Sequence, residues 1–188
     1  MLLLLKLLLP YFTVGIFWCV FKNAWIALLS YHAFILCFAR GAKVRFTLTF
    51  PKPFWGLIAP SILAGPLLFF ILPWIGVESL RDWLTDYSVT TSHLLLIPYF
   101  GLIHPTIEQM HWAPLCQKTP LAHLCFAGYH IMVLASLLSP LWLGVSFLTL
   151  ASVSVFWHIL RIKSQSISPA ALSHTLADLS IVSLLLVS

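Results

Sequence analysis

Charged residues are scarce in this sequence. Ten Lys and Arg and five Asp and Glu occur among 188 residues, so that charged side chains make up only 8% of the chain. An average soluble domain carries roughly 25% charged residues. So few charges cannot cover the water-facing surface of a protein of this size, which excludes an ordinary soluble domain and a disordered chain.

Two other signatures are missing. The basic residues form no patch with interleaved aromatic side chains, so we expect no nucleic-acid partner despite the net charge of +5. The four cysteines include no C-x-x-C pair and lie at irregular spacing, which gives no sign of a cysteine metal or redox site. The oligomeric state leaves no trace in the sequence.

Long apolar runs dominate what is present. Hydrophobic residues make up 61% of the chain, and the mean hydropathy is +1.00. A helix needs about 20 apolar residues to cross a bilayer. We therefore expect an all-α, polytopic transmembrane helical bundle with about seven spans, within a range of six to eight. The expected spans are 2–21, 24–39, 54–75, 89–111, 120–138, 141–160 and 168–187.

The loops between these spans differ in charge. The loop 40–53 carries four basic residues and no acid, whereas the loop 76–88 carries three acids and one base. Alternating spans place the loops 40–53, 112–119 and 161–167 together, and all three carry basic residues. The positive-inside rule makes their side cytoplasmic. We expect a multi-pass protein of a cell inner membrane or an ER-type membrane, with the N-terminus cytoplasmic and the C-terminus non-cytoplasmic.

Two acids lie inside expected spans, namely Glu108 and Asp178. An ionisable group at this depth costs at least about 2.5 kcal/mol, so it is a functional candidate by default. His104, Glu108 and His111 follow spacings of four and three residues, which put them on one helix face.

Two further spans carry paired residues four positions apart. The first pair is Phe126 and His130, and the second is His174 and Asp178. At 1.5 Å per residue, the expected topology puts Glu108, His130 and His174 ~6, ~15 and ~9 Å from the cytoplasmic ends of their spans. All three would lie in the cytoplasmic half of the bilayer, which indicates one shared site.

A carboxyl group and two imidazoles suit hydrolysis without a Ser or Cys nucleophile. Glu108 can act as a general base on water, with a neighbouring histidine to orient the water and carry the proton. A second histidine beside Asp178 can stabilise an oxyanion. The alternative is a zinc or iron site, with Glu108, His130 and His174 as the ligands.

At these residues the sequence resembles the CPBP family of membrane-embedded proteases, which includes type II CAAX prenyl endopeptidases and Abi proteins. The family motifs are EExxxR, FxxxH and HxxxN or HxxxD. Glu108 matches the first glutamate, Phe126 with His130 matches the second motif, and His174 with Asp178 matches the third. The resemblance covers about residues 90–188, so that 89–188 forms a catalytic core and 1–88 forms variable N-terminal spans of one integral domain.

The resemblance implies an intramembrane endopeptidase that cuts a membrane-associated peptide or protein near the cytoplasmic face. Glu108 and His130 would activate the attacking water, and His174 and Asp178 would hold the oxyanion. The resemblance implies no metal, although zinc stays an alternative. Four residues are expected in supporting roles, and these are His104, Gln109, His111 and Phe126.

The first motif departs from the family at two positions, because Gln109 replaces the second glutamate and Ala113 replaces the arginine. A catalytically silent CPBP-fold protein, acting in binding or bacteriocin immunity, is therefore an alternative. A transporter or proton relay ranks last, because paired discontinuous helices are missing. The four other histidines are expected to be structural, namely His32, His93, His123 and His158.

Overall fold

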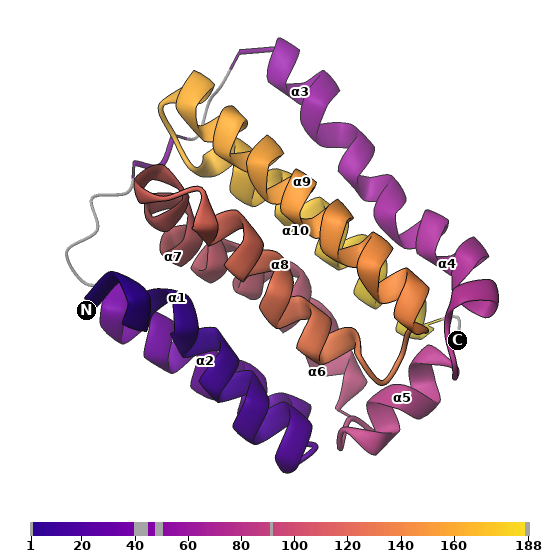
Figure 1. Cartoon of the computed structure of the whole chain (residues 1–188). Helices are drawn as coiled ribbons and strands as arrows, with labels where there is room; N and C mark the ends of the chain where they lie inside the picture. The colour runs from indigo at the N-terminus through magenta and orange to yellow at the C-terminus, as the bar shows by residue number, and fades with distance from the viewer. Residues whose placement is uncertain (1, 40–44, 48–50, 91, 187–188) are drawn as a thin grey trace.

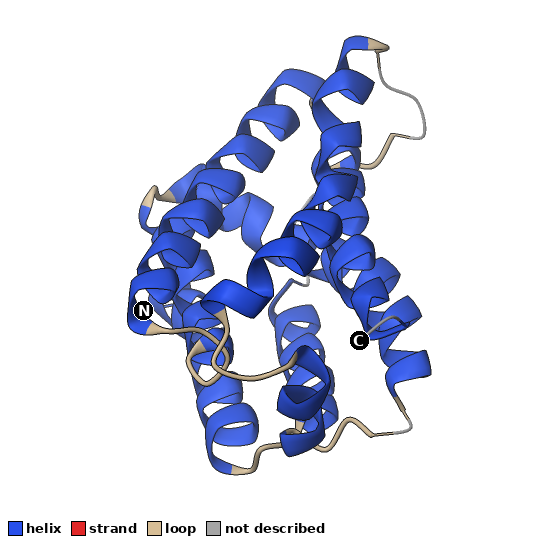
Figure 2. Ribbon diagram, turned by 90° about the vertical axis from the view of Figure 1, so that its right-hand side faces the viewer, coloured by secondary structure: helices blue, strands red, loops and turns tan. Residues whose placement is uncertain are grey.

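The computed structural model describes residues 2–39, 45–47, 51–90 and 92–186, and these are helical almost throughout (Figures 1 and 2). The all-α expectation is confirmed, since the described residues form no strand. The elements are α1 (Leu2–Thr13), η1 (Val14–Val20), α2 (Ala24–Ala39), α3 (Pro53–Ile58), η2 (Ala59–Leu63), α4 (Ala64–Ile75), α5 (Leu80–Asp86), α6 (His93–Pro98), η3 (Tyr99–Ile103), α7 (His104–Lys118), α8 (Leu121–Leu134), α9 (Pro140–Ser164), α10 (Ser168–Val182) and η4 (Ser183–Leu186).

Three helical stretches are long and apolar enough to cross a membrane. They are Leu2–Val20, Pro53–Ile75 and Pro140–Ser164, with 19, 23 and 25 residues. Two shorter apolar helices, Ala24–Phe38 and Leu121–Leu134, lie within further expected spans. The count of about seven spans stays a prediction, and so does the side of the membrane on which each loop lies. Arg40 and Lys43 of the basic loop lie outside the described residues.

The outer surface of the bundle is apolar. Large hydrophobic side chains such as Trp74, Leu141 and Phe70 are 86%, 74% and 72% exposed. Within the stretch Pro53–Ile75, only 11% of the most apolar 18-residue segment is buried inside the bundle. Soluble monomers rarely expose apolar patches larger than a few hundred Å². This surface is compatible with a location in a membrane, where lipid would cover it.

Helix α10 lies in the middle of the bundle. It packs against the α3–η2–α4 stretch on one side and against η3 and α7 on another, while α9 covers it as well. Helices α1 and α2 form the opposite flank and pack on α8 and α7 (Figure 1). The side chains of α7 and α10 therefore meet inside the bundle, away from its apolar outer surface.

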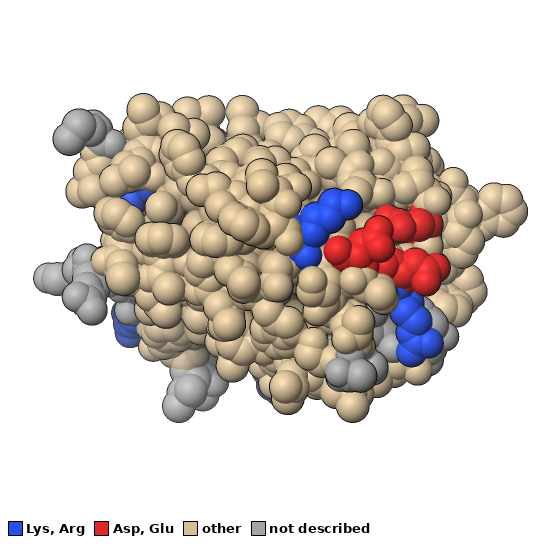
Figure 3. All heavy atoms as spheres, turned by 90° about the horizontal axis from the view of Figure 1, so that it is seen from below, with Lys and Arg blue, Asp and Glu red and all other residues tan. Residues whose placement is uncertain are grey.

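The acidic loop forms a distinct feature at one end of the bundle. Glu78 precedes α5, and Asp82 and Asp86 belong to it. Figure 3 shows these acidic side chains gathered at one place beside basic atoms, on a face that is otherwise mostly uncharged. Helix α9 ends with Arg161 and Lys163. In Figure 1 that end of α9 lies opposite α5.

Glycine allows a close contact between α4 and α10. A Cβ atom built on Gly65 of α4 would lie 2.1 Å from the backbone oxygen of Ser180. The backbone nitrogen of Gly65 also donates a hydrogen bond to the Ser180 hydroxyl at 2.9 Å. Small residues let helix backbones approach in this way in membranes. Gly65 thus fixes the distance between α4 and the helix that carries His174.

We expect Gly65→Ala to destabilise the protein. The added methyl group meets backbone atoms of Ser180, which cannot move without shifting α10. Overpacking of this kind costs about 1–3 kcal/mol. The loss is measured by thermal unfolding in detergent micelles, followed by circular dichroism.

Gly56→Ala is the matched control, because a Cβ atom on Gly56 has no neighbour within 4 Å. This variant should unfold at or above the wild-type temperature. Equal losses of stability in the two variants would contradict the close contact between α4 and α10.

Candidate functional site

The site is built around the carboxyl group of Glu108 on α7. Glu108 is 0% exposed, the lowest value possible for an ionisable side chain. Its Oε1 atom accepts a hydrogen bond from the hydroxyl of Tyr31 on α2 at 2.5 Å and another from Tyr129 on α8. Trp112 in turn donates from Nε1 to the Tyr31 hydroxyl at 3.0 Å. Three helices therefore hold one oxygen of this carboxyl in place.

The second oxygen of Glu108 faces two imidazoles. Its Oε2 atom lies 3.5 Å from Nε2 of His104 and 3.8 Å from Nε2 of His174. The same His174 nitrogen lies 3.2 Å from Oδ2 of Asp178, one turn further along α10. All four side chains are buried. The structure thus brings together three residues of the sequence motifs, Glu108, His174 and Asp178. The expected supporting residue His104 lies with them.

His32 lies in contact with the cluster, which the sequence does not predict. We expect it to be structural, yet its Nε2 atom lies 2.8 Å from Nδ1 of His104 and its Nδ1 atom lies 2.9 Å from the hydroxyl of Tyr99. A hydrogen-bonded chain therefore runs from Tyr99 through His32 to His104. His32 is 3% exposed and sets the orientation of a ring that faces Glu108. It belongs to the site.

His130 approaches Glu108 only indirectly. Its Nε2 atom lies 3.1 Å from the hydroxyl of Tyr129, which donates to Glu108. Its Nδ1–H donates to the backbone oxygen of Phe126 at 2.8 Å. Tyr129 thus stands between the two residues that the family resemblance pairs. The arrangement allows a proton to pass between Glu108 and His130 through one hydroxyl group.

The supporting residues take different places. The amide nitrogen of Gln109 lies 3.5 Å from Nδ1 of His174, on the ring edge away from Glu108. Phe126 is 1% exposed and packs against the rings of His130 and His174. His111 instead faces α1, where its Nε2 atom lies 3.1 Å from the backbone oxygen of Lys6. His111 is therefore outside the cluster, although its spacing puts it near the face of Glu108.

A proline-flanked π-helical turn precedes α7. Proline has no backbone N–H to donate, so Pro98 and Pro105 interrupt the regular helical hydrogen bonding on both sides of η3. Such π turns occur frequently at functional sites. Gly101 within η3 lets this turn approach α10, since a Cβ atom there would lie 3.0 Å from the Leu179 Cα. The local sequence therefore brings His104 close to His174.

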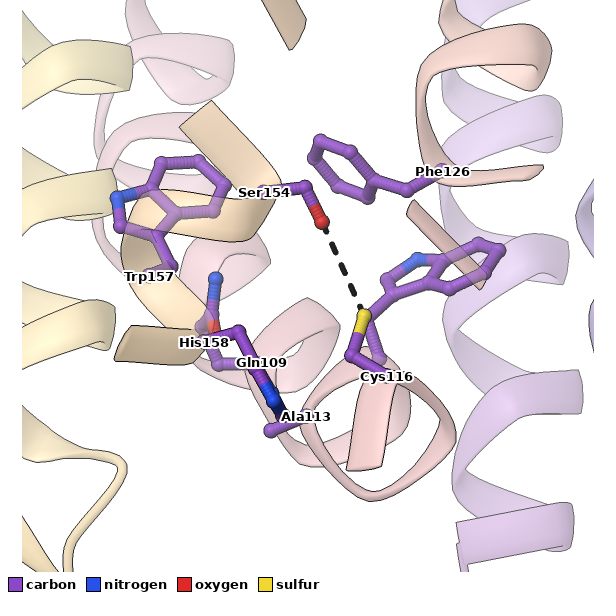
Figure 4. A pocket seen from close by; sticks show the side chains of 8 residues that line it. Gln109, Ala113, Cys116, Phe126, Ser154, Trp157 and His158 are labelled. Carbon is purple, nitrogen blue, oxygen red and sulfur yellow. Dashed lines mark hydrogen bonds between the residues drawn. The ribbon is translucent and has the colours of Figure 1, made fainter. Parts of the chain in front are cut away.

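A small cavity adjoins the cluster behind Gln109 (Figure 4). Its volume is about 10 Å³, space for about one water molecule. Ala113 lines it, at the position where the family motif has arginine. Cys116 and Ser154 lie 3.8 Å apart across it and share a hydrogen bond. Because the side chain of Ala113 is short, the cavity stays open beside Gln109, the residue whose amide faces His174.

The remaining histidines lie elsewhere. The Nδ1 atom of His123 is 2.8 Å from the Ser154 hydroxyl, and its ring packs on that of His158. These contacts agree with structural roles for both. The side chain of His93 lies outside the described residues.

Three residues that contact the cluster are not predicted from the sequence, and these are Tyr31, His32 and Tyr129. A Tyr–His pair occurs at 31–32 and again at 129–130, each within a charge-free segment. Polar rings inside otherwise apolar spans are the signal that could have identified them.

Comparisons with known proteins find no match: no family model, no curated protein and no solved structure is significantly similar to this chain. The resemblance to the CPBP family therefore rests on the motif residues given above.

We expect Tyr31→Phe to lower the free energy of unfolding by about 1–3 kcal/mol, because it removes a donor from a buried carboxyl and an acceptor from Trp112. Chemical denaturation in micelles measures the loss.

Tyr11→Phe provides the comparison, since the Tyr11 hydroxyl donates only to the neutral backbone oxygen of Cys125 at 2.9 Å. Hydrogen bonds to charged groups are about twice as strong as neutral ones. A loss in Tyr31→Phe no greater than that in Tyr11→Phe would argue against Glu108 as an anchored centre.

Proposed function

We propose that this protein is a multi-pass intramembrane endopeptidase that hydrolyses a peptide bond with a water activated at Glu108. The observation that carries the proposal is the arrangement around the carboxyl of Glu108. One of its oxygens accepts two tyrosine hydroxyls, and the other has two imidazole nitrogens within 3.8 Å. A side chain anchored on one oxygen presents the other to a reactant in fixed geometry.

In this proposal Glu108 takes the proton of the attacking water as a general base. His130, whose Nε2 atom is 3.1 Å from the Tyr129 hydroxyl, holds this proton through that hydroxyl and gives it back to Glu108 by the same path. The imidazole of His174, whose Nε2 atom lies 3.2 Å from Asp178 and 3.8 Å from Glu108, stabilises the negative charge that develops on the carbonyl oxygen. The carboxyl later returns a proton to the leaving amine, which completes the hydrolysis.

The proposed membrane placement rests on surface and charge. The apolar exterior suits lipid, and the seven expected spans coincide in their main parts with helical stretches. Basic residues Arg161 and Lys163 end α9, while the acids of α5 lie at the other end of the bundle. The positive-inside rule then assigns the α9–α10 turn to the cytoplasm. We propose a membrane-associated peptide or protein as the substrate.

The resemblance to the CPBP family supports the same function, because residues of its three motifs adjoin one another in the bundle. Glu108, Phe126 with His130, and His174 with Asp178 come from α7, α8 and α10. Phe126 packs on both histidines, with ring centroids 4.5 and 6.4 Å apart.

A second function is favoured by one observation, the loss of the first motif's second glutamate and arginine. Gln109 and Ala113 occupy these positions beside the small cavity. A catalytically silent protein of the same fold, acting in binding or bacteriocin immunity, keeps the buried cluster as a structural element. Removing both charged groups together leaves no unpaired buried charge, so stability is retained without catalysis.

The test compares wild type with Glu108→Gln. Each is reconstituted into liposomes with a library of membrane-anchored peptides, and new peptide termini are identified by mass spectrometry. We expect wild type to cleave and Glu108→Gln to lose at least about 100-fold in rate, since a general base contributes 10²–10⁴-fold.

Glu78→Gln is the matched control, because Glu78 precedes the short helix α5 at the end of the bundle and lies outside the site. It should cleave like wild type. Cleavage by Glu108→Gln at the wild-type rate overturns the proposed role of Glu108, and an inactive but folded wild type favours the silent alternative.

A further inference from the structure

We infer that His104, His174 and Asp178 form a binding site for a divalent metal ion of the zinc class. The inference deepens the proposed function and rests on it for the role of the metal, although metal binding itself is measured separately. One nitrogen from each imidazole and one carboxylate oxygen of Asp178 lie within 4.8 Å of one another. All three residues are buried.

The spacing of these atoms suits a tetrahedral ion. Zinc bonds to nitrogen and oxygen of about 2.0–2.2 Å place neighbouring ligands of a tetrahedron about 3.3–3.6 Å apart. Nε2 of His174 and Oδ2 of Asp178 are 3.2 Å apart, and the other separations in the set are at most 4.8 Å. Both residues sit one turn apart on α10, so the helix itself sets the distance between two of the three ligands.

Two buried carboxylate oxygens in the cluster have only imidazole nitrogens near them, and no hydroxyl or amide donor. These are Oδ2 of Asp178 and Oε2 of Glu108, and the imidazole nitrogens lie 3.2–3.8 Å away from them. Buried polar atoms nearly always find a partner, so each exception requires an explanation. A cation held by the two imidazoles and Asp178 gives Oδ2 of Asp178 a partner and leaves Oε2 of Glu108 beside the open position.

The surroundings of the two imidazoles suit metal ligation. Nδ1 of His104 can donate to Nε2 of His32 at 2.8 Å, and His32 can donate to the hydroxyl of Tyr99 at 2.9 Å. With these proton positions, Nε2 of His104 keeps a free lone pair for a metal. Trp157 stacks on the His174 ring at a centroid distance of 4.1 Å and fixes its plane. Partners of this kind orient metal-bound histidines generally.

This set differs from the sequence-based alternative of Glu108, His130 and His174. Nδ1 of His130 is engaged by the backbone oxygen of Phe126, and its Nε2 atom faces the Tyr129 hydroxyl, so neither nitrogen is free. His104 takes its place. Glu108 is assigned a different role, because its Oε2 atom lies beside both imidazole nitrogens and borders the fourth coordination position.

Three protein ligands with an open fourth position are typical of catalytic zinc, whereas structural zinc has four. Two imidazoles and one carboxylate suit zinc better than calcium or magnesium, which prefer oxygen ligands. A metal there would polarise a carbonyl or a water molecule next to the Glu108 carboxyl. The metal and the general base would then serve one reaction.

The experiment measures metal binding and cleavage on the same samples. Protein purified in micelles is stripped with a chelator, dialysed against zinc chloride and assayed by elemental mass spectrometry. We expect equimolar zinc in wild type and in Glu108→Gln, with cleavage only in wild type. His104→Ala and Asp178→Asn should lose zinc, and His32→Phe should bind it about 10–100-fold more weakly.

Cobalt(II) gives a second readout that needs no variant, because a tetrahedral nitrogen and oxygen site produces intense visible absorption in wild type. His123→Ala is the control and should keep zinc, since His123 contacts Ser154 outside the cluster. If the wild-type protein binds no zinc and gives no tetrahedral cobalt spectrum, the proposed metal site is wrong, even if the protein cleaves peptides. Full zinc binding by His104→Ala, or its loss from Glu108→Gln, overturns the assignment of these residues. Zinc binding without cleavage leaves the metal site and overturns only the hydrolase.

Discussion

The fold is organised around one buried carboxyl group. Moving Glu108 out of water carries a large desolvation cost, which only hydrogen bonds or opposite charge can offset. Its partners come from α2, α7, α8 and α10, so that each of these helices must pack with its polar face inward. The apolar faces are left outside, where Trp74 and Phe70 are among the most exposed side chains. A polar centre with an apolar surface suits a protein surrounded by lipid better than one surrounded by water.

The sequence predicted the parts of this centre that follow helical spacing. His104 with Glu108, and His174 with Asp178, are four residues apart, and each pair meets as the spacing requires. Helix positions were also predictable, since charge-free runs and proline mark them. Contacts between helices were not, because no local pattern fixes how α2 rotates against α7. Tyr31 and His32 therefore came to light only in the fold, and His111, despite its spacing, faces α1.

The proposed hydrolysis and the proposed metal site make different demands on the same cluster. Hydrolysis needs an oxygen of Glu108 that is free to take a proton, and Tyr31 and Tyr129 secure this by holding the other oxygen. A metal ion needs lone pairs on His104 and His174, and the chain through His32 to Tyr99 can provide the first of these. The two demands meet at Nε2 of His174, where a bound metal would replace the imidazole in stabilising the carbonyl oxygen while Glu108 stays the base. Gln109 and Ala113 alter only the periphery, next to His174 and the small cavity.

The most direct test of this account is cleavage of membrane-anchored peptides in water labelled with oxygen-18. Wild-type protein in liposomes should produce new C-termini that carry the label, because water supplies one oxygen of each new carboxyl group. The same termini should be missing with Glu108→Gln. Equal amounts of labelled termini from both proteins, or none from folded wild type, would contradict the claim that Glu108 activates water for peptide hydrolysis.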